Sequence, residues 1–213
     1  MIIDERLVTY INSLDTGNTE ILDTIEKEAL DTYVPIIRKE MQGFLKLLLA
    51  MKRPARILEV GTAVGFSAIL MAEYDPVECE ITTIENYEKR IPIARENFKR
   101  AGKEHQITLL EGDATEILKE LTGPYDFIFM DAAKGQYIHF MPDILRLLKP
   151  EGLLVSDNVL QDGDIIESHF IVTRRNRTIH KRMREYLYAL THSEELVTSV
   201  LPIGDGVTVS VRK

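Results

Sequence analysis

The sequence predicts an α/β protein built on a doubly wound, mainly parallel sheet of seven strands. After Pro54, short apolar segments alternate with amphipathic helical segments, which is the pattern of strands joined by crossover helices. Near the carboxyl end, residues 202–206 are too few for a crossover helix, so they predict a hairpin and an antiparallel last strand. Before Pro54 the patterns are helical, and they predict an N-terminal helical extension.

Each element follows from its local pattern of apolar residues, caps and breakers. Asn18 and Thr19 are suited to cap a first helix, and Pro35 is suited to open a second. The expected helices are 20–33, 35–51, 66–74, 87–101, 115–121, 138–148 and 177–190. The expected strands are 56–60, 80–84, 107–110, 125–130, 153–156, 196–201 and 207–211. Without a linker or repeat, we expect one domain, 1–213, with a helical extension, 1–53, and an α/β core, 54–213.

Composition excludes several classes of protein. The chain has 213 residues and a single cysteine, Cys79, so it cannot form an internal disulfide, a cysteine zinc cluster or a C-x-x-C redox pair. No apolar run approaches the ~18 residues of a membrane span. The first residues carry Asp4 and Glu5, where a signal peptide would be basic. We therefore expect a cytoplasmic protein that does not enter a membrane.

One basic segment stands out from a chain whose net charge is −8. It contains no acidic residue and comprises Arg174, Arg175, Arg177, Lys181, Arg182 and Arg184. A cationic segment on an acidic protein indicates an anionic partner such as nucleic acid. The alternatives are a solvated helix face or a dimer contact. Where the helix extends far enough, Arg174, Arg177, Lys181 and Arg184 share one face of it.

Three expected strand ends carry groups suited to a nucleoside, because open α/β sheets bind ligands beyond the carboxyl ends of their strands. Gly61 and Gly65 allow close approach of a ligand, although their spacing differs from G-x-G-x-x-G. The departure favours an uncharged or cationic nucleoside over a pyrophosphate, and a plain strand-to-helix turn is the alternative. Glu85 is placed to accept hydrogen bonds from ribose hydroxyls. Asp113 or its neighbours are placed to contact a base.

Two further strand ends predict a metal site. Asp131 follows one strand, and Asp157 and Asn158 follow the next. Two carboxylates and an amide oxygen form a hard, all-oxygen donor set that suits Mg²⁺ better than zinc, whereas a lone aspartate would more often cap a helix. Lys134 would stand beside that cation, where its charged form is disfavoured and it can act as a base. The five histidines, His105, His139, His169, His180 and His192, show no metal-ligand spacing.

Four motifs together resemble a known family. They are E-V-G-T-A-V-G-F-S at 59–67, the acidic Glu85, M-D-A-A-K at 130–134 and S-D-N-V at 156–159. Over roughly residues 35–213 the chain resembles class I S-adenosylmethionine-dependent methyltransferases of the catechol O-methyltransferase type. The endings L-P-I-G-D-G and V-S-V-R-K and the arginine-rich segment are similar to the bacterial tRNA 5-hydroxyuridine methyltransferases within it.

The resemblance implies roles for particular residues. Asp131, Asp157 and Asn158 would bind Mg²⁺, and Lys134 would be the catalytic lysine. The cofactor site would include Ile37, Gly61, Ser67, Glu85, Asp113, Ala114 and Asp131. Ala133 stands where the catechol enzyme has a tryptophan, which predicts a larger or flatter entrance. Bacterial relatives of this type are often homodimers, so a homodimer is expected here.

The leading functional prediction is methylation of 5-hydroxyuridine at the wobble position of tRNA, giving 5-methoxyuridine. It depends on the basic segment, whose residues are expected to bind the tRNA backbone. The alternative is an O-methyltransferase of small catechol-like or phenylpropanoid metabolites, because a catechol offers Mg²⁺ the same pair of neighbouring oxygens. A non-catalytic nucleotide- or RNA-binding module and an NAD-dependent oxidoreductase are weaker alternatives.

Overall fold

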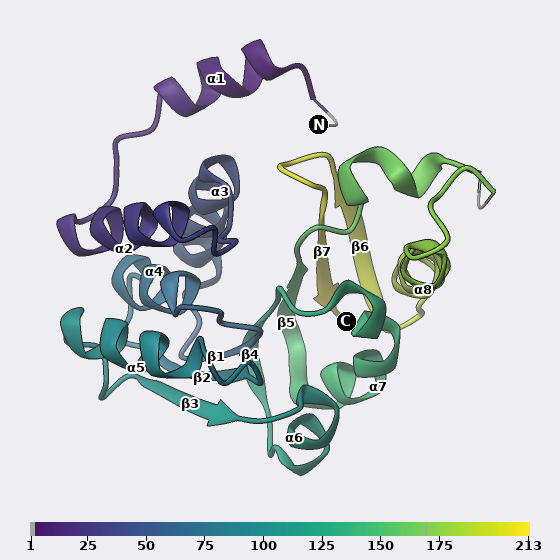
Figure 1. Ribbon diagram of the computed structural model, residues 1–213. Coiled ribbons are helices and arrows are strands. Elements are labelled where there is room, and N and C mark those ends of the chain that lie inside the picture. The colour runs from purple at the N-terminus through teal and green to yellow at the C-terminus, as the bar shows by residue number, and fades with distance from the viewer. Residues whose placement is uncertain (1–2, 169) are drawn as a thin grey trace.

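The computed structural model describes residues 3–168 and 170–213 (Figure 1). Its strands are β1 (Arg56–Val60), β2 (Glu80–Glu85), β3 (Ile107–Glu111), β4 (Tyr125–Met130), β5 (Leu148–Ser156), β6 (Leu196–Leu201) and β7 (Val207–Arg212). Its α-helices are α1 (Glu5–Ser13), α2 (Glu20–Asp31), α3 (Lys39–Lys52), α4 (Phe66–Tyr74), α5 (Ile91–Arg100), α6 (Ala114–Glu120), α7 (Tyr137–Leu147) and α8 (Arg177–Thr191). Two 3₁₀ helices, η1 (Lys134–Gln136) and η2 (Gln161–Ile166), complete the list.

The strands form one seven-stranded sheet in the order β3-β2-β1-β4-β5-β7-β6. β1 to β5 are parallel, whereas β7 runs antiparallel to both β5 and β6. The predicted fold class is therefore confirmed, including the antiparallel last strand. The strand order changes direction between β1 and β4, and chains leaving such a point diverge and open a crevice at the carboxyl edge.

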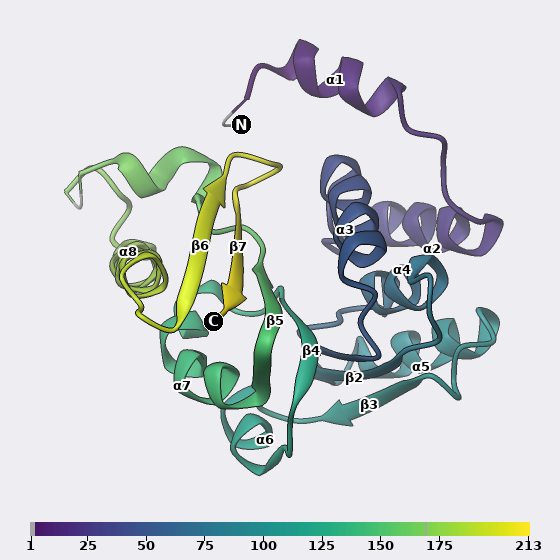
Figure 2. The same cartoon turned by 180° about the vertical axis from the view of Figure 1, so that it is seen from behind.

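Helices cover both faces of the sheet (Figures 1 and 2). α2, α3, α4 and α5 lie on one face (Figure 1), where Leu45, Leu49 and Phe66 belong to the same buried apolar cluster as Phe127 of β4. α6, α7 and α8 lie on the other face, where Met183 and Tyr186 join a second apolar cluster. The central strands are buried on both faces, which explains their continuous apolar sequences. The carboxyl edge is left for ligands.

Helix α1 was not among the predicted elements. It begins after Asp4, whose side chain accepts a hydrogen bond from the Arg6 N–H, and none of its residues is buried. It lies apart from the sheet and contacts α3, where Asn12 donates to Glu40 at 3.4 Å (Figure 1). With nine residues, α1 is shorter than the window of about 11–18 residues over which a helical pattern is read.

The prediction that a helix opens at Pro35 is wrong, because α3 begins at Lys39. Arg38, at the N-cap, has an extended backbone (φ −66°, ψ 156°). The buried Gln42 side chain donates to the Ile37 carbonyl at 3.1 Å, which fixes the extended segment before the helix. Ile37 lies in this extended segment and not in α3. It is only 4% exposed, and it lines the crevice at the carboxyl edge.

One cap and two smaller boundaries also differ. Thr19 is the N-cap of α2, but its hydroxyl donates to Glu73 at 2.5 Å and forms no cap hydrogen bond. α5 begins at Ile91, because residues 87–90 form a turn. β5 begins at Leu148, and its register against β4 shifts between Tyr125 and Phe127. Within the described part of the chain, no helix is long and apolar enough to cross a membrane.

Candidate active site

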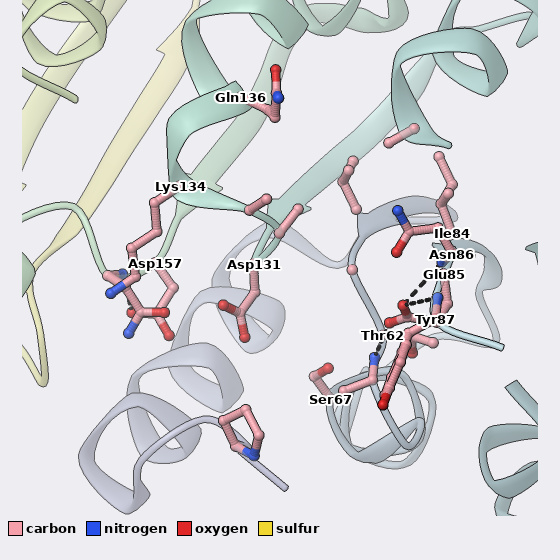
Figure 3. Close-up of a pocket in the computed structure, with 18 of the residues that line it drawn as sticks. Thr62, Ser67, Ile84, Glu85, Asn86, Tyr87, Asp131, Lys134, Gln136 and Asp157 are labelled. Atoms are coloured by element: carbon pink, nitrogen blue, oxygen red, sulfur yellow. Dashed lines mark hydrogen bonds between the residues drawn. The ribbon is translucent and has the colours of Figure 1, made fainter. Parts of the chain in front are cut away.

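A cavity of about 690 Å³ lies at the carboxyl edge of the sheet (Figure 3). Its walls come from the strand ends, from the segment 35–38 and from the turn before β7. Every predicted cofactor, metal and catalytic residue lines it: Ile37, Gly61, Ser67, Glu85, Asp113, Ala114, Asp131, Lys134, Asp157 and Asn158. The structure thus brings the two predicted sites into one continuous cavity.

The turn after β1 needs both of its glycines. Gly61 has a φ of +95°, and a Cβ there would lie 2.3 Å from the Asp131 carbonyl oxygen. Gly65 has a φ of +86°, and a Cβ there would lie 2.5 Å from the Phe98 ring. A side chain at Gly61 would force the β1 turn away from the end of β4, and one at Gly65 would displace the Phe98 ring. Gly61 therefore lets the β1 turn lie directly against the end of β4.

Glu85 is held in place before any ligand binds. One carboxylate oxygen accepts from the Ala63 N–H at 2.8 Å, and the other accepts from the Asn86 and Tyr87 N–H groups at 2.9 and 2.8 Å (Figure 3). Its exposed fraction is 8%. A carboxylate has about four lone-pair sites, so acceptor capacity remains for ribose hydroxyls. The geometry is that of a fixed acceptor on the cavity wall.

A second glutamate, Glu59, lies beneath this wall and was not singled out in the sequence. It is fully buried, and it accepts a hydrogen bond from the hydroxyl of Ser67 and another from that of Thr83 at 2.5 Å. Burial raises the pKa of Glu59 to about 7 from an ordinary value of 4.5. Its place inside the E-V-G-T motif was the available signal. It orients the predicted cofactor residue Ser67.

Asp113 caps helix α6. Its carboxylate accepts from the Thr115 N–H at 2.7 Å, and this hydrogen bond lowers the pKa of Asp113. Asp113 and Ala114 both line the cavity, so a base contact is still geometrically open to them. The cap, which is the ordinary role of an aspartate before a helix, is what the structure shows.

The predicted metal residues meet at the opposite end of the cavity. Burial raises the pKa of Asp131, although the Lys134 charge opposes that rise. Burial also raises the pKa of Asp157, and the negative charge of Asp131 raises it further. Asp157 is 3% exposed and accepts from the Asn158 N–H at 2.7 Å. Among residues 3–168 and 170–213, no group of three His, Cys, Asp or Glu side chains is placed for a metal. The predicted set thus depends on the amide oxygen of Asn158.

A buried tyrosine joins the two strand ends that carry this set. The hydroxyl of Tyr137 lies 3.1 Å from the carbonyl oxygen of Met130 and 3.2 Å from that of Asp157. Its ring packs edge-on against Tyr186, with ring centroids 5.4 Å apart. Tyr137 therefore sets the spacing between Asp131, which follows Met130, and Asp157.

Lys134 has a partner that the sequence analysis missed. Its Nζ donates to Oδ2 of Asp205 at 3.1 Å, and Asp205 is 4% exposed. Asp205 belongs to the turn between β6 and β7. Because β6 runs in the same direction as β5, this turn reaches the carboxyl edge of the sheet. The aspartate within P-I-G-D-G was the signal, but its position depended on the direction of β6.

The basic segment is divided by the structure. Arg177 donates to the Val172 and Phe170 carbonyls at 3.2 and 3.3 Å, and Arg182 donates to the Gly135 carbonyl at 3.2 Å. Lys181 forms an ion pair with Glu185 at 3.7 Å. The other three, Arg174, Arg175 and Arg184, are exposed.

The predicted row of four basic residues on one helix face is not formed, because α8 begins at Arg177 and Arg174 lies in the preceding turn. His180, within the same segment, is buried in α8. His169 lies outside the described residues.

The fold and cavity define a class: a doubly wound nucleotide-binding enzyme with an acidic oxygen site beside its cofactor cleft. A family model described as O-methyltransferase matches residues 12–213. Catechol O-methyltransferase of Niastella koreensis is 38% identical over 173 residues, covering 78% of each chain. Caffeoyl-CoA O-methyltransferase 2 of Populus trichocarpa is 31% identical over 180 residues, covering 79% of this chain and 71% of the relative.

Solved structures agree. A crystal structure of a candidate caffeoyl-CoA O-methyltransferase from Staphylococcus aureus has a TM-score of 0.90 and 31% identity, covering 99% of this chain and 100% of the other. An SAH-bound methyltransferase from Podospora anserina has a TM-score of 0.87 and 28% identity, covering 98% and 94%. The chain belongs to the class I, S-adenosylmethionine-dependent O-methyltransferase family.

Proposed function

We propose that this protein transfers the methyl group of S-adenosylmethionine, with the help of Mg²⁺, to a hydroxyl that has a second oxygen beside it. One observation carries the proposal. A single cavity holds a fixed carboxylate, Glu85, at one end and three oxygen donors with a lysine at the other. The first end suits a ribose, and the second suits a chelating acceptor.

The cofactor would lie along the β1 turn. Glu85 would accept hydrogen bonds from its ribose hydroxyls, and Ile37 and Ser67 would line the same wall. Asp131 lies between the two ends of the cavity, where its negative charge would favour the sulfonium of the methyl donor (Figure 3). The product of methyl transfer carries no sulfonium charge, so the same carboxylate attracts the product less than the substrate.

The donor set fits a divalent cation. Burial and the neighbouring Asp131 carboxylate raise the pKa of Asp157, and a cation held by both carboxylates would offset that repulsion. Asp131, Asp157 and Asn158 would hold it. When bound, Mg²⁺ would act as a Lewis acid that orients the acceptor and lowers the pKa of its hydroxyl.

Lys134 would take the hydroxyl proton at Nζ as the acceptor oxygen bonds to the methyl carbon and the carbon–sulfur bond breaks. The atoms balance with one methyl ether, one thioether and one protonated lysine. The cavity wall formed by Phe66 and Phe140 limits the water around the reacting atoms.

Small catechol-like or phenylpropanoid molecules are the acceptors that the comparisons favour. The relatives are named for catechol and for caffeoyl-CoA, which both present neighbouring oxygens on an aromatic ring. Ala133 at the rim leaves space beside such a ring. These acceptors need no phosphate contacts, so this candidate assigns no function to the exposed arginines.

A 5-hydroxyuridine in tRNA is the second candidate, and the exposed arginines favour it. Its 5-hydroxyl lies beside a 4-carbonyl, which gives the metal the same pair of oxygens. Arg174, Arg175 and Arg184 are exposed on a chain of net charge −8. Arg182, from the same segment, bonds to Gly135 beside Lys134, so the segment lies near the active site. Exposed cations at such a place suit an RNA backbone.

The test compares both acceptors on one preparation. The enzyme, with S-adenosylmethionine and Mg²⁺, is given caffeic acid in one assay and an anticodon stem-loop containing 5-hydroxyuridine in another. A triple variant, Arg174, Arg175 and Arg184 to Ala, should lose stem-loop affinity, and its salt slope should fall by about 0.7–0.9 per lost phosphate contact. A charge-matched control changes Lys27, Lys99 and Lys119 to Ala, which all lie away from the basic segment.

The two candidates give different outcomes. Methylation of the stem-loop that depends on the three arginines, with little turnover of caffeic acid, supports the tRNA function. Turnover of caffeic acid that is equal in wild type and triple variant, with no stem-loop product, supports the small-molecule function. Turnover of neither acceptor, or full turnover in excess chelator, contradicts the proposed chemistry.

A further inference from the structure

We propose that Asp205 is a positioning residue for Lys134: it fixes the lysine amine at the acceptor end of the cavity and sets its place relative to Asp157 and Asn158. The inference rests on the proposed function, because it takes Lys134 as the base. Asp205 comes from a turn far along the chain, and it belongs to none of the predicted cofactor, metal or catalytic sets.

The contact between the two side chains is direct. Nζ of Lys134 lies 3.1 Å from Oδ2 of Asp205, and the Asp205 side chain is 4% exposed, whereas that of Lys134 is 35% exposed. A buried carboxylate that accepts a hydrogen bond from the lysine amine is a strong anchor, because leaving that carboxylate without its donor would be costly. The lysine side chain has four rotatable bonds, so an anchor of this kind removes much of its rotational freedom.

Asp205 is itself held rigidly. Its backbone carbonyl accepts from the Leu160 N–H at 2.9 Å, and the Gly206 carbonyl accepts from the Val159 N–H at 2.9 Å. Its other carboxylate oxygen, Oδ1, accepts from the Asp162 N–H. Gly206 has a φ of +86°, and a Cβ there would lie 2.2 Å from the Leu160 side chain. The turn between β6 and β7 is therefore hydrogen-bonded to the backbone that directly follows Asn158.

This arrangement links the base to the metal ligands. Asp157 and Asn158 lead straight into Val159 and Leu160, and those two residues hold the turn that carries Asp205. Lys134 is thus connected to the proposed metal ligands through two backbone hydrogen bonds and its own contact with Asp205. Misplacing a catalytic group by about 1 Å can cost on the order of a hundredfold in rate. The hydrogen bonds of the turn hold Asp205 in place, and Asp205 in turn prevents such a displacement of the Lys134 amine.

Asp205 also faces Asp157 closely enough to raise its pKa, so a role at the metal is the competing explanation. A positioning residue and a metal-site residue predict different behaviour. The first acts through Lys134 and leaves the Mg²⁺ requirement unchanged. The second changes the Mg²⁺ requirement whether or not Lys134 is present.

A double-mutant cycle separates these explanations. Wild type, Asp205→Asn, Lys134→Ala and the double variant are compared for kcat, for KM of the acceptor and for S-adenosylmethionine affinity, at saturating Mg²⁺. Asp205→Asn should lower kcat on the order of ten- to a hundredfold with cofactor affinity kept. In the Lys134→Ala background, the same change should cause no further loss, because residues that act as a unit are not additive. The matched control is Asp164→Asn, which changes an exposed aspartate of η2 in the same way and should leave kcat unchanged.

Other outcomes overturn the inference. Equal losses from Asp205→Asn with and without Lys134 would show an independent, merely structural role. Recovery of kcat in Asp205→Asn as Mg²⁺ is raised would assign Asp205 to the metal. If Asp205→Asn does not fold, Asp205→Ser keeps an acceptor for the Asp162 N–H and takes its place in the cycle.

Chemical labelling of Lys134 tests its position without measuring turnover, so a failure of this inference can be distinguished from a failure of the proposed function. An amine-reactive reagent should label Lys134 several-fold faster in Asp205→Asn than in wild type, with Lys119 as the internal standard. Unchanged labelling would overturn the positioning role. Full kcat in Lys134→Ala would instead contradict the proposed function.

Discussion

The two ends of the cavity differ in how their charges are compensated. At the cofactor end, the Glu85 carboxylate already accepts three backbone N–H groups, so its charge is stabilised by fixed dipoles. At the acceptor end, burial and the Asp131 carboxylate raise the pKa of Asp157, and the Lys134 amine is turned to Asp205. The charge at the first end is compensated by backbone groups of the protein, whereas the second end brings two carboxylates together. A nucleoside would therefore meet a preformed wall, and the proposed cation would stabilise the acceptor end.

The largest expected effect comes from breaking the acceptor end. Asp157→Asn should lower turnover by more than about a hundredfold, because a metal contributes several kcal/mol to such a reaction. In chelator at neutral pH, the same variant should unfold at a higher temperature than wild type, since a buried and repelled carboxylate is removed. Methyl transfer and thermal unfolding measure the two effects. Asp31→Asn, on the exposed end of α2, is the control, and full turnover in Asp157→Asn contradicts the metal assignment.

A smaller effect is expected from the cofactor end. Glu85→Gln should raise the dissociation constant of S-adenosylmethionine about tenfold, because hydrogen bonds to a charged acceptor are worth about 1.5–3 kcal/mol. Turnover at saturating cofactor should stay near wild type, since Glu85 lies at the ribose and not at the transferred methyl. Calorimetry gives the affinity, and circular dichroism checks the fold. An unchanged dissociation constant would remove Glu85 from the cofactor site.

The smallest effect concerns the buried layer under the cofactor wall. The pKa of Glu59 is raised from 4.5 to about 7, so the folded state binds its proton more tightly than the unfolded state. The free energy of unfolding should therefore fall as pH rises from about 4.5 to 7. Glu59→Gln should flatten that part of the pH profile. Urea unfolding at several pH values tests it, and a profile equally steep in the variant contradicts it.

The same division explains what the sequence could predict. Alternating strands and helices define the order of the parallel sheet, and strand ends meet at one edge, so Glu85, Asp131 and Asp157 were all placed in the cavity before the structure was known. Each of these residues lies at or directly after the end of a parallel strand, so its position follows from the order and direction of the strands.

The features that were missed depend on contacts between distant segments. Ile37 was among the predicted cofactor residues, but the extended backbone that places it at the cavity was missed, because a buried hydrogen bond from Gln42 overrides the helical pattern. Asp205 required the direction of β6. Arg177 and Arg182 looked like free cations in the sequence, but carbonyl oxygens of neighbouring segments accept their hydrogen bonds. A local sequence pattern does not show which distant groups will accept hydrogen bonds from these side chains.

The position of β7 has a consequence for the order of assembly during synthesis. β7 lies between β5 and β6, so β6 has no place in the sheet until the strand after it has been made. A nascent chain can build the parallel strands and fill the cofactor wall while residues 196–212 are still in the ribosome. Lys134 then lacks its carboxylate, because Asp205 arrives only with the closing hairpin. The protein should thus acquire cofactor affinity early in synthesis and its catalytic geometry last, which keeps methyl transfer silent in unfinished chains.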